Sequence, residues 1–345
     1  MTKTKLLSPV KIGNLELKNK VVMALMCMYS VEKEDGIITD FHKIHYGARA
    51  LGGVSLINIE GTAIDVNGRI SSRDLGLWNQ EQANAFKDLI ATLHKFGSKV
   101  GIQLSHAGRK ATGTEDLIAP SEIAYNEDFG TPREMTLSDI DTIVEKFGIS
   151  AKYAEEAGAD LIEVHAAHGY LLNEFISPLT NKRTDEYGGT LENRYRLVRR
   201  VIDKVKEVFS GSIWVRISAN EYDEKGTTMD EFIQIARWMK EQGVEVIDVS
   251  SGGVIEVTPD KIYPGYQVER ATKIKNEVGI DVSVVGFLND PKLAEFLLQT
   301  NQTSLISLGR PLLANPNWIQ NAAKELRAED DIQLYNASYE RGRII

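Results

Sequence analysis

The stretch GADLIEVH, residues 158–165, has the form of a buried strand that follows a helix-ending glycine. The stretches GGVSLINIE (52–60), GVEVIDVS (243–250) and QTSLISLG (302–309) have the same form. Each places a short run rich in Ile, Val and Leu after a turn or loop and ends in small or polar residues, which is typical of a buried parallel strand. The repeated form therefore predicts a parallel sheet.

More stretches of this kind bring the number of predicted strands to eight: NKVVMAL (19–25), KVGIQLSH (99–106), SIWVRIS (212–218) and DVSVVGF (281–287). Amphipathic segments with helix-capping signals lie between the strands. They span 79–97 from Asn79, 138–157 from Ser138, and a third segment from Thr228 to just before Gly243.

The alternation of strand and helix continues without a shift in composition or a linker, so we expect one domain over residues 1–345. Eight such units favour a closed (β/α)8 TIM barrel of the α/β class. An open doubly wound sheet is the alternative. The stretch VKIGNLEL (10–17) alternates around the turn-forming pair Gly13-Asn14, which predicts an N-terminal β-hairpin that caps the bottom of the barrel.

The composition limits the compartment and the kinds of partner that we expect for this protein. The single cysteine, Cys27, excludes an intramolecular disulfide and an all-cysteine metal site, as is common in a reducing compartment. No signal-like segment is present, and no apolar run approaches the roughly 18 residues of a membrane span. We therefore expect a cytoplasmic protein without a membrane partner. The net charge of −9 disfavours nucleic acid as a partner, because phosphate binding draws on an excess of Lys and Arg.

Polar residues and glycines gather where the predicted strands end, which is where barrels of this kind carry their chemistry. In chain order these residues are Met26, Cys27, Tyr29, Gly61, Gln103, His106, His165, His168, Arg216, Ser250, Ser251, Gly252, Gly286, Gly309 and Arg310. The glycines of the last three strands expose backbone N–H groups to which a phosphate can come close, and Arg310 supplies a counter-charge. This pattern favours a phosphorylated ligand.

His165, His168 and Tyr170 stand together at the end of one strand, and their spacing alone leaves three interpretations open. Two histidines three apart can be half of a metal site, but zinc takes three or four protein ligands and no cysteine or third histidine lies nearby. We therefore predict no metal. The remaining interpretations are a ligand-facing set and a set of packed core side chains.

Several motifs carry a resemblance to the old yellow enzyme family, and more narrowly to its thermophilic-like branch of bacterial NADPH dehydrogenases. These are HAAHGYLLNEFISPLTNKRTDEYGGTLENRYR (165–196), MCMYS (26–30), GIQLSHAGRKA (101–111), LGRPLL (308–313) and YERG (339–342). The resemblance implies an FMN-dependent enzyme, reduced by NADPH, that passes hydride to an enone or nitro compound. By the same resemblance, FMN contacts Ala24, Leu25, Met26, Cys27, Gly61, Gln103, Arg216, Gly286, Gly309 and Arg310.

The resemblance also implies roles at the substrate. His165 and His168 bind the substrate oxygen, Tyr170 donates a proton, and Tyr29 lines the same pocket. Arg341 reaches the active site of a neighbouring subunit, which implies a homo-oligomer, a dimer or a tetramer. Cys27 sulfur near the flavin ring tunes its potential or is simply a small buried side chain.

The sequence departs from the family at two places. Ala24-Leu25 stands where Ser-Pro is usual, so a hydroxyl hydrogen bond and a rigid ring are absent, and Gly61 stands where alanine is usual. No G-x-G-x-x-G motif follows a strand, so we expect NADPH to bind over the flavin in the substrate's place. A flavin-binding sensor or scaffold and a flavin-free phosphate-binding barrel enzyme are the alternative functions.

Overall fold

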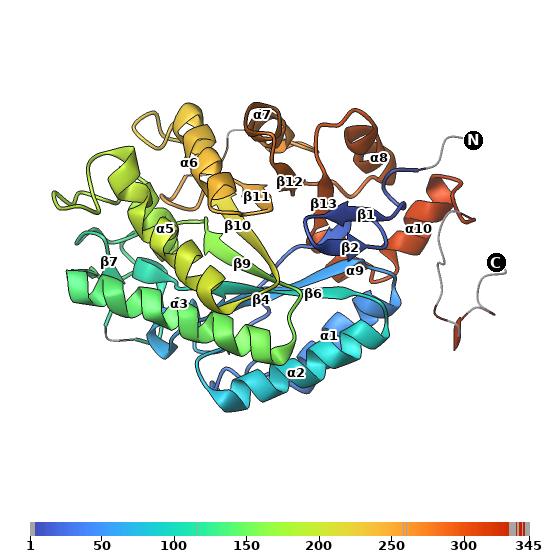
Figure 1. The fold of residues 1–345 in the computed structure, drawn as a ribbon, viewed down its shortest axis with the longest axis horizontal. Helices are drawn as coiled ribbons and strands as arrows, with labels where there is room; N and C mark the ends of the chain where they lie inside the picture. Colours follow the sequence, from blue (N-terminus) through green and yellow to red (C-terminus); the bar gives the residue numbers. More distant parts are fainter. Residues whose placement is uncertain are drawn as a thin grey trace.

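The barrel predicted from the repeated strands is present. The computed structural model describes residues 4–114, 116–257, 259, 261–330, 336, 338–339 and 341. In this part of the chain, parallel strands form a ring with helices around it (Figure 1). The strands of the ring are β3 (Val21–Met23), β4 (Leu56–Ala63), β6 (Lys99–Ser105), β9 (Leu161–Ala166), β10 (Ser212–Ser218), β11 (Val246–Ser250), β12 (Asp281–Val284) and β13 (Leu305–Leu308).

The ring is closed because β3 pairs with the last strand as well as with the next one. Met23 is in register with Leu308 of β13 and with Ile57 of β4. The predicted (β/α)8 barrel is therefore confirmed, and an open sheet is excluded. A short strand, β5 (Leu75–Gly76), pairs parallel with the end of β4.

The helices form the outer layer of the barrel (Figure 1). They are α1 (Asp40–Leu51), α2 (Gln80–Lys95), α3 (Leu137–Ala157), α5 (Leu191–Val208), α6 (Met229–Glu241), α7 (Val268–Val278), α8 (Pro291–Gln299) and α10 (Trp318–Glu325). Shorter elements are α4 (Leu171–Ile176), α9 (Arg310–Ala314), and the 3-10 turns η1 (Val66–Gly68) and η2 (Gly108–Lys110).

Two helix starts agree with the predicted caps and one does not. The Asn79 side chain accepts from the Gln82 N–H at the start of α2, and Thr228 caps α6 through Glu231. The prediction that a helix starts at Ser138 is wrong, because Thr136 is the N-cap of α3 and accepts from the Asp139 N–H. Thr and Asp at this spacing form the same reciprocal cap as Thr and Glu.

The predicted hairpin closes the lower end of the barrel. Strands β1 (Val10–Ile12) and β2 (Leu15–Leu17) pair antiparallel, and their inward residues Ile12, Leu15 and Leu17 are almost fully buried. They pack on an apolar ring formed by the lower ends of the strands: Val22, Leu56, Leu161, Trp214, Val246 and Leu305. The hairpin therefore fills this end of the barrel, which leaves the opposite, carboxyl end of the strands for a ligand.

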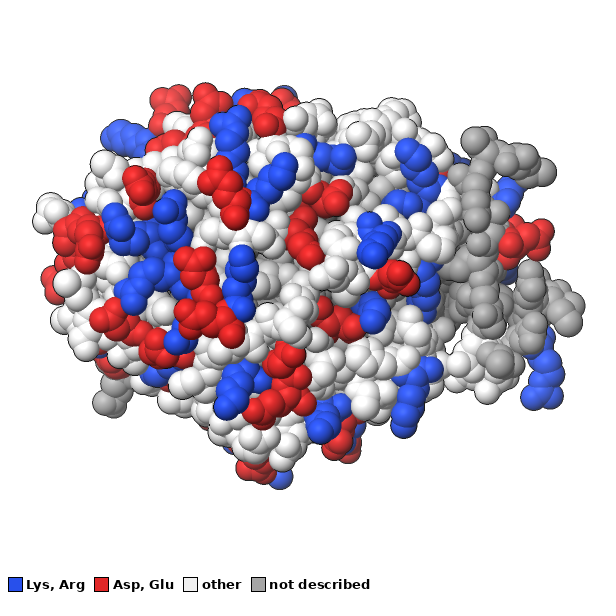
Figure 2. Space-filling view, viewed as in Figure 1, with Lys and Arg blue, Asp and Glu red and all other residues white. Residues whose placement is uncertain are grey.

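The charged surface is mixed in sign. On the face shown in Figure 2, Lys and Arg side chains lie among Asp and Glu side chains. Among the helices of the described residues, none is long and apolar enough to cross a bilayer.

Candidate active site

A cavity of about 490 Å³ opens at the carboxyl ends of the strands. The predicted cofactor residues Ala24, Leu25, Met26, Arg216, Gly286, Gly309 and Arg310 all line it. These side chains and backbone segments come from β3, β10, β12 and β13 and from the turns that follow them. Residues that were predicted from their positions at strand ends therefore meet at one cavity, although they lie up to 286 positions apart in the chain.

The rim of the cavity between β12 and β13 is shaped by two glycines. Gly286 has φ +133°, a conformation that a side chain would strain, and Gly309 faces Met26, whose Sδ would lie 3.2 Å from a Cβ at this position. The Arg310 guanidinium lies over the Phe287 ring, 4.5 Å from its centroid. Exposed backbone and a cation held by an aromatic ring are suited to an anionic group.

Cys27, Gly61 and Gln103 form a second group next to this cavity. A Cβ at Gly61 would lie 3.4 Å from the Cys27 Sγ and 3.5 Å from the Gln103 Oε1. Both distances are ordinary contacts, so an alanine would fit and the space opened by Gly61 is small. Burial, with Asp74 and Glu60 nearby, raises the pKa of Cys27 to about 12, so the side chain is a neutral thiol.

Charged side chains lie inside the barrel next to the cavity, and one of them, Arg216, is part of its lining. Arg216 Nε is 3.3 Å from the Asp248 Oδ2, and both side chains are almost fully buried. Burial raises the pKa of Asp248, and Arg216 opposes that shift. Inside the barrel, Gln103 and Glu163 also form a hydrogen bond, at 2.8 Å.

His165, His168 and Tyr170 lie together beside the cavity. The His165 ring centroid is 5.3 Å from that of His168 and 5.1 Å from that of Tyr170. His168 Nε2 lies 2.7 Å from the Oγ of Ser250, which lines the cavity. The three predicted side chains therefore lie together; none of them is among the residues that line the cavity, and His168 adjoins the lining through Ser250.

The turn after β9 presents His168 from a left-handed backbone conformation. Its φ is +59°, which is unusual for a residue with a side chain. The His168 N–H donates to Ser218 Oγ at 2.9 Å, and a Cβ at Gly253 would lie 2.6 Å from the His168 Cα. Only a glycine at position 253 therefore lets the backbone there approach the turn at His168 so closely.

Burial controls the protonation of the three side chains. It lowers the pKa of His165 and of His168 well below the ordinary 6.5, and neighbouring cations such as Arg216 lower them further. Burial also raises the pKa of Tyr170 well above 10. At neutral pH all three groups are therefore uncharged, and each neutral imidazole has one N–H donor and one acceptor nitrogen.

Lys110 is a site residue that the sequence analysis did not assign. Its Nζ donates to the carbonyl oxygens of His168 at 3.0 Å and Gly253 at 3.2 Å, and lies 5.1 Å from the Tyr170 ring centroid. Burial lowers its pKa to about 8. It belongs to the GIQLSHAGRKA motif, so its place after a strand end was a usable signal.

The cavity residues Tyr266 and Gln267 were also missed. Gln267 accepts from Ser251 Oγ at 2.7 Å and donates to the Val285 carbonyl at 2.9 Å, which ties two of the strand-end turns together. Both residues precede α7 rather than follow a strand, so no pattern in the sequence pointed to them.

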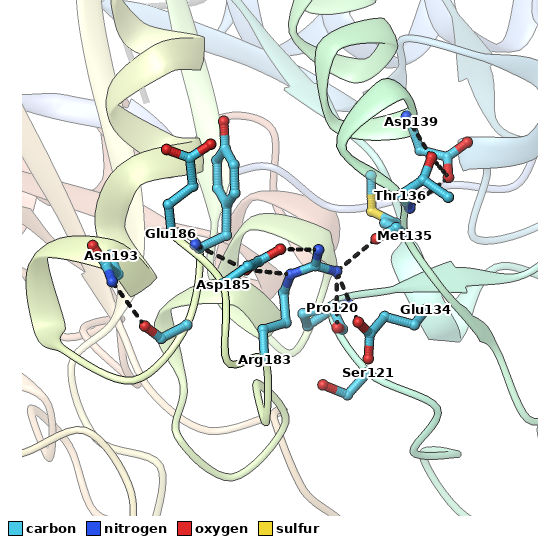
Figure 3. Close-up of polar contacts among 12 residues, drawn as sticks. Pro120, Ser121, Glu134, Met135, Thr136, Asp139, Arg183, Asp185, Glu186 and Asn193 are labelled. Carbon is cyan, nitrogen blue, oxygen red and sulfur yellow. Dashed lines mark hydrogen bonds and ion pairs between the residues drawn. The ribbon is translucent and has the colours of Figure 1, made fainter.

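The loops after β6 and β9 are braced by Arg183, as Figure 3 shows. This buried guanidinium donates to the Met135 carbonyl at 2.6 Å and to Asp185 Oδ1 at 3.0 Å. Lys182 N–H donates to Ser121 Oγ at 2.9 Å. The small strands β7 (Ile118–Ala119) and β8 (Arg133–Glu134) lie in the braced loop.

Two predicted substrate residues lie at the surface. The Tyr29 residue is 41% exposed and has φ +51°. Arg341 is exposed and does not line the cavity. Its predicted place in a neighbouring subunit stays a prediction. Among the described residues, no group of three or more His, Cys, Asp or Glu is placed to hold a metal ion.

Comparison with known proteins gives the family. The model of the NADH:flavin oxidoreductase / NADH oxidase family matches residues 5–329. The chain belongs to this family. It is 47% identical to the NADPH dehydrogenase of Geobacillus sp. (strain WCH70) over 339 residues, which cover 98% of each chain.

Solved structures of the family have the same fold. Morphinone reductase is 26% identical, with a TM-score of 0.81, and the match covers 97% of this chain and 92% of that one. The old yellow enzyme homologue from Zymomonas mobilis is 25% identical, with a TM-score of 0.80 and 93% of each chain covered. The predicted resemblance to the old yellow enzymes is confirmed, and this family member is a flavin-dependent oxidoreductase.

Proposed function

We propose that the protein is an FMN-dependent NADPH dehydrogenase that reduces the activated C=C bond of α,β-unsaturated carbonyl compounds, and nitro compounds as well. The observation that carries this proposal is the placement of two neutral histidines and a tyrosine beside a cavity lined by glycines and Arg216. The family membership supports the same chemistry.

The residues around the cavity fit FMN. Arg216 lines the cavity, and its guanidinium, whose Nε faces Asp248, is a fixed positive charge that suits the flavin edge on which reduction places negative charge. Gly286, Gly309 and Arg310 suit the phosphate, and Gln103 suits the pyrimidine edge. Bound FMN would carry hydride from NADPH to the β-carbon of the substrate.

His165 and His168 would hold the substrate oxygen. Reduction of an activated C=C builds negative charge on the carbonyl or nitro oxygen, and two neutral imidazole N–H groups directed at it act as an oxyanion hole. One such donor can be worth about 3–4 kcal/mol. Because the two rings are buried, neither needs to lose or gain a proton during the reaction.

Tyr170 would supply the proton to the α-carbon. Its phenol is 5.1 Å, between ring centroids, from His165, so one substrate can contact both. Although its pKa is raised, the enolate that forms is a strong base and accepts the proton. Tyr29 would line the same pocket, and NADPH would bind in the substrate's place, which predicts ping-pong kinetics.

The proposal is tested by the colour of the purified protein and by its two half-reactions. We expect a yellow protein with flavin absorption that bleaches on anaerobic addition of NADPH and recovers on addition of cyclohexenone. A colourless protein that takes up no added FMN would contradict the proposal and favour a flavin-free phosphate-binding barrel. Full flavin loading without turnover would favour a sensor or scaffold.

We further propose that the chain is one FMN-binding domain that works in the cytoplasm as a homo-oligomer, with Arg341 at the active site of a neighbouring subunit. The family match over residues 5–329 supports the single domain. Light scattering on the purified protein tests the oligomer. In an oligomer, R341A should raise the KM for cyclohexenone and leave the number of subunits unchanged. An unchanged KM would contradict the proposed place of Arg341.

A further inference from the structure

Glu163 is a fully buried carboxyl group that the proposed reaction does not use. It lies on β9, in register with Gln103 of β6. Gln103 Nε2 donates to its Oε1 at 2.8 Å, and Asn58 Nδ2 donates to its Oε2 at 3.2 Å. Asn58 reaches across β6 because Gly101 has no side chain: a Cβ there would lie 2.1 Å from the Asn58 Oδ1.

The hydrogen bond determines which way the Gln103 amide faces. The Gln103 Nε2 donates to the Glu163 Oε1, and the ionised carboxylate can accept only from the amide NH2, so the NH2 of Gln103 is directed to Glu163. Its Oε1 is then directed to Gly61, at 3.5 Å from the Cβ position there, on the side of Cys27. A glutamine amide that is not held in this way can turn over and present a donor instead of an acceptor.

This orientation holds whether or not Glu163 carries a proton. Burial, assisted by Asp248, raises the pKa of Glu163 to about 8. The proton is accommodated on Oε2, because the buried Asn58 Oδ1 has no hydrogen-bond partner within the described residues and can accept it once the Asn58 amide turns over. Oε1 stays an acceptor for Gln103 in both states.

We propose that Glu163 is a positioning residue that fixes Gln103 with its carbonyl oxygen toward the flavin pyrimidine edge. This inference rests on the proposed FMN binding. An acceptor in that place suits the N3–H of the pyrimidine, and a turned amide would set an NH2 against it. A mismatched pair of buried donors costs free energy that a matched pair does not.

The test is the affinity of the apoprotein for FMN in substitutions of Glu163. E163L removes the acceptor, and we expect the Kd for FMN to rise about tenfold. E163Q resembles the protonated acid, keeps the acceptor for Gln103, and should bind FMN within about twofold of wild type. E163M repeats the apolar change with a more adaptable side chain if E163L does not fold.

The matched control is N58A, which removes the other hydrogen bond of the same carboxyl group. We expect N58A to lower Tm as a buried deletion does and to keep the wild-type Kd at about pH 9, where Glu163 is ionised and both of its oxygens accept. The coupling between Glu163 and Gln103 in FMN binding is then measured in the Q103A background. If Glu163 acts through Gln103, adding E163L to Q103A changes the Kd for FMN by less than about twofold.

Three results would overturn the inference. They are an unchanged Kd in E163L and E163M, a loss in E163Q as large as in E163L, and additive losses in the double variant. These results differ from a failure of the proposed function, in which the wild-type apoprotein takes up no FMN at all.

Discussion

His165 and His168 are neutral because they are buried, and this has a consequence for the dependence of the rate on pH. Their pKa values lie well below the ordinary 6.5, so both rings are neutral at neutral pH and each has one N–H donor. We expect the rate of enone reduction by the reduced enzyme to show no titration with a pKa near 6.5. Stopped-flow measurements between pH 6 and 8 check this, and a clear step near 6.5 would contradict it.

Replacing His168 tests its role as a donor to the substrate oxygen. We expect H168A to slow enone reduction about 10²–10³-fold, because it removes one of two donors at the developing oxyanion, and H168N to retain more of the rate. The comparison is made on the second half-reaction, with enzyme reduced beforehand. H94N is the control, since His94 pairs with Asp160 at the outer surface, 2.6 Å away. Equal rates in H168A and wild type would show that His168 does not act as a donor to the substrate oxygen.

At the scale of single elements, Arg183 connects two loops that are far apart in sequence. It joins the segment around Met135 to Asp185 and contacts Glu134 at 3.5 Å (Figure 3). R183M removes the cation and leaves buried carbonyl oxygens without donors, which costs about 1–3 kcal/mol. We expect faster hydrogen exchange in residues 117–135 and an unchanged rate in β9.

The control for Arg183 is a second arginine on a neighbouring helix. R200M removes a half-exposed guanidinium that donates to the Tyr187 OH and to Asp141, both of which lie outside residues 117–135. Its effect on exchange in residues 117–135 should be absent. Equal exchange in R183M and wild type would show that β7 and β8 hold the loop without the brace.

The elements differ in how far they could be predicted from sequence. The buried parallel strands could be predicted because an apolar run with a polar end is a pattern of consecutive residues. Asn79 and Thr228 could be predicted as helix starts for the same reason. The start of α3 was misplaced by reading Ser138 as the cap. The Arg183 brace was not visible, since its partner carbonyl belongs to a residue 48 positions away.

At the scale of the whole molecule, the closure of the barrel determines which site residues can be predicted from the sequence. Residues at strand ends converge on one rim, so Arg216, Gly286 and Gly309 could be predicted to meet. Tyr266 and Gln267 enter the same cavity from the segment before α7, and their position depends on how that segment packs. Arg341 lies beyond the barrel strands, and no local pattern specifies where it goes.

The buried carboxyl groups make the stability of the whole molecule depend on pH. Burial raises the pKa of Glu174 and of Glu163 to about 8, against about 4.5 in an unfolded chain. Between these values the folded protein binds a proton that the unfolded chain has released, so the free energy of unfolding falls as pH rises, by at most about 1.4 kcal/mol per pH unit for each group.

We therefore expect these carboxyl groups to lower Tm between pH 6.5 and pH 8, and comparison with E174Q separates their effect from that of histidines, which titrate near the lower limit of this window. E174Q keeps an acceptor for the Arg109 N–H, which donates to Glu174 at 3.0 Å, and cannot ionise. Its Tm should fall less steeply over this window. E192Q, at an exposed position of α5, should keep the wild-type slope. The same slope in E174Q and wild type would mean that Glu174 is already ionised in the folded protein at pH 6.5.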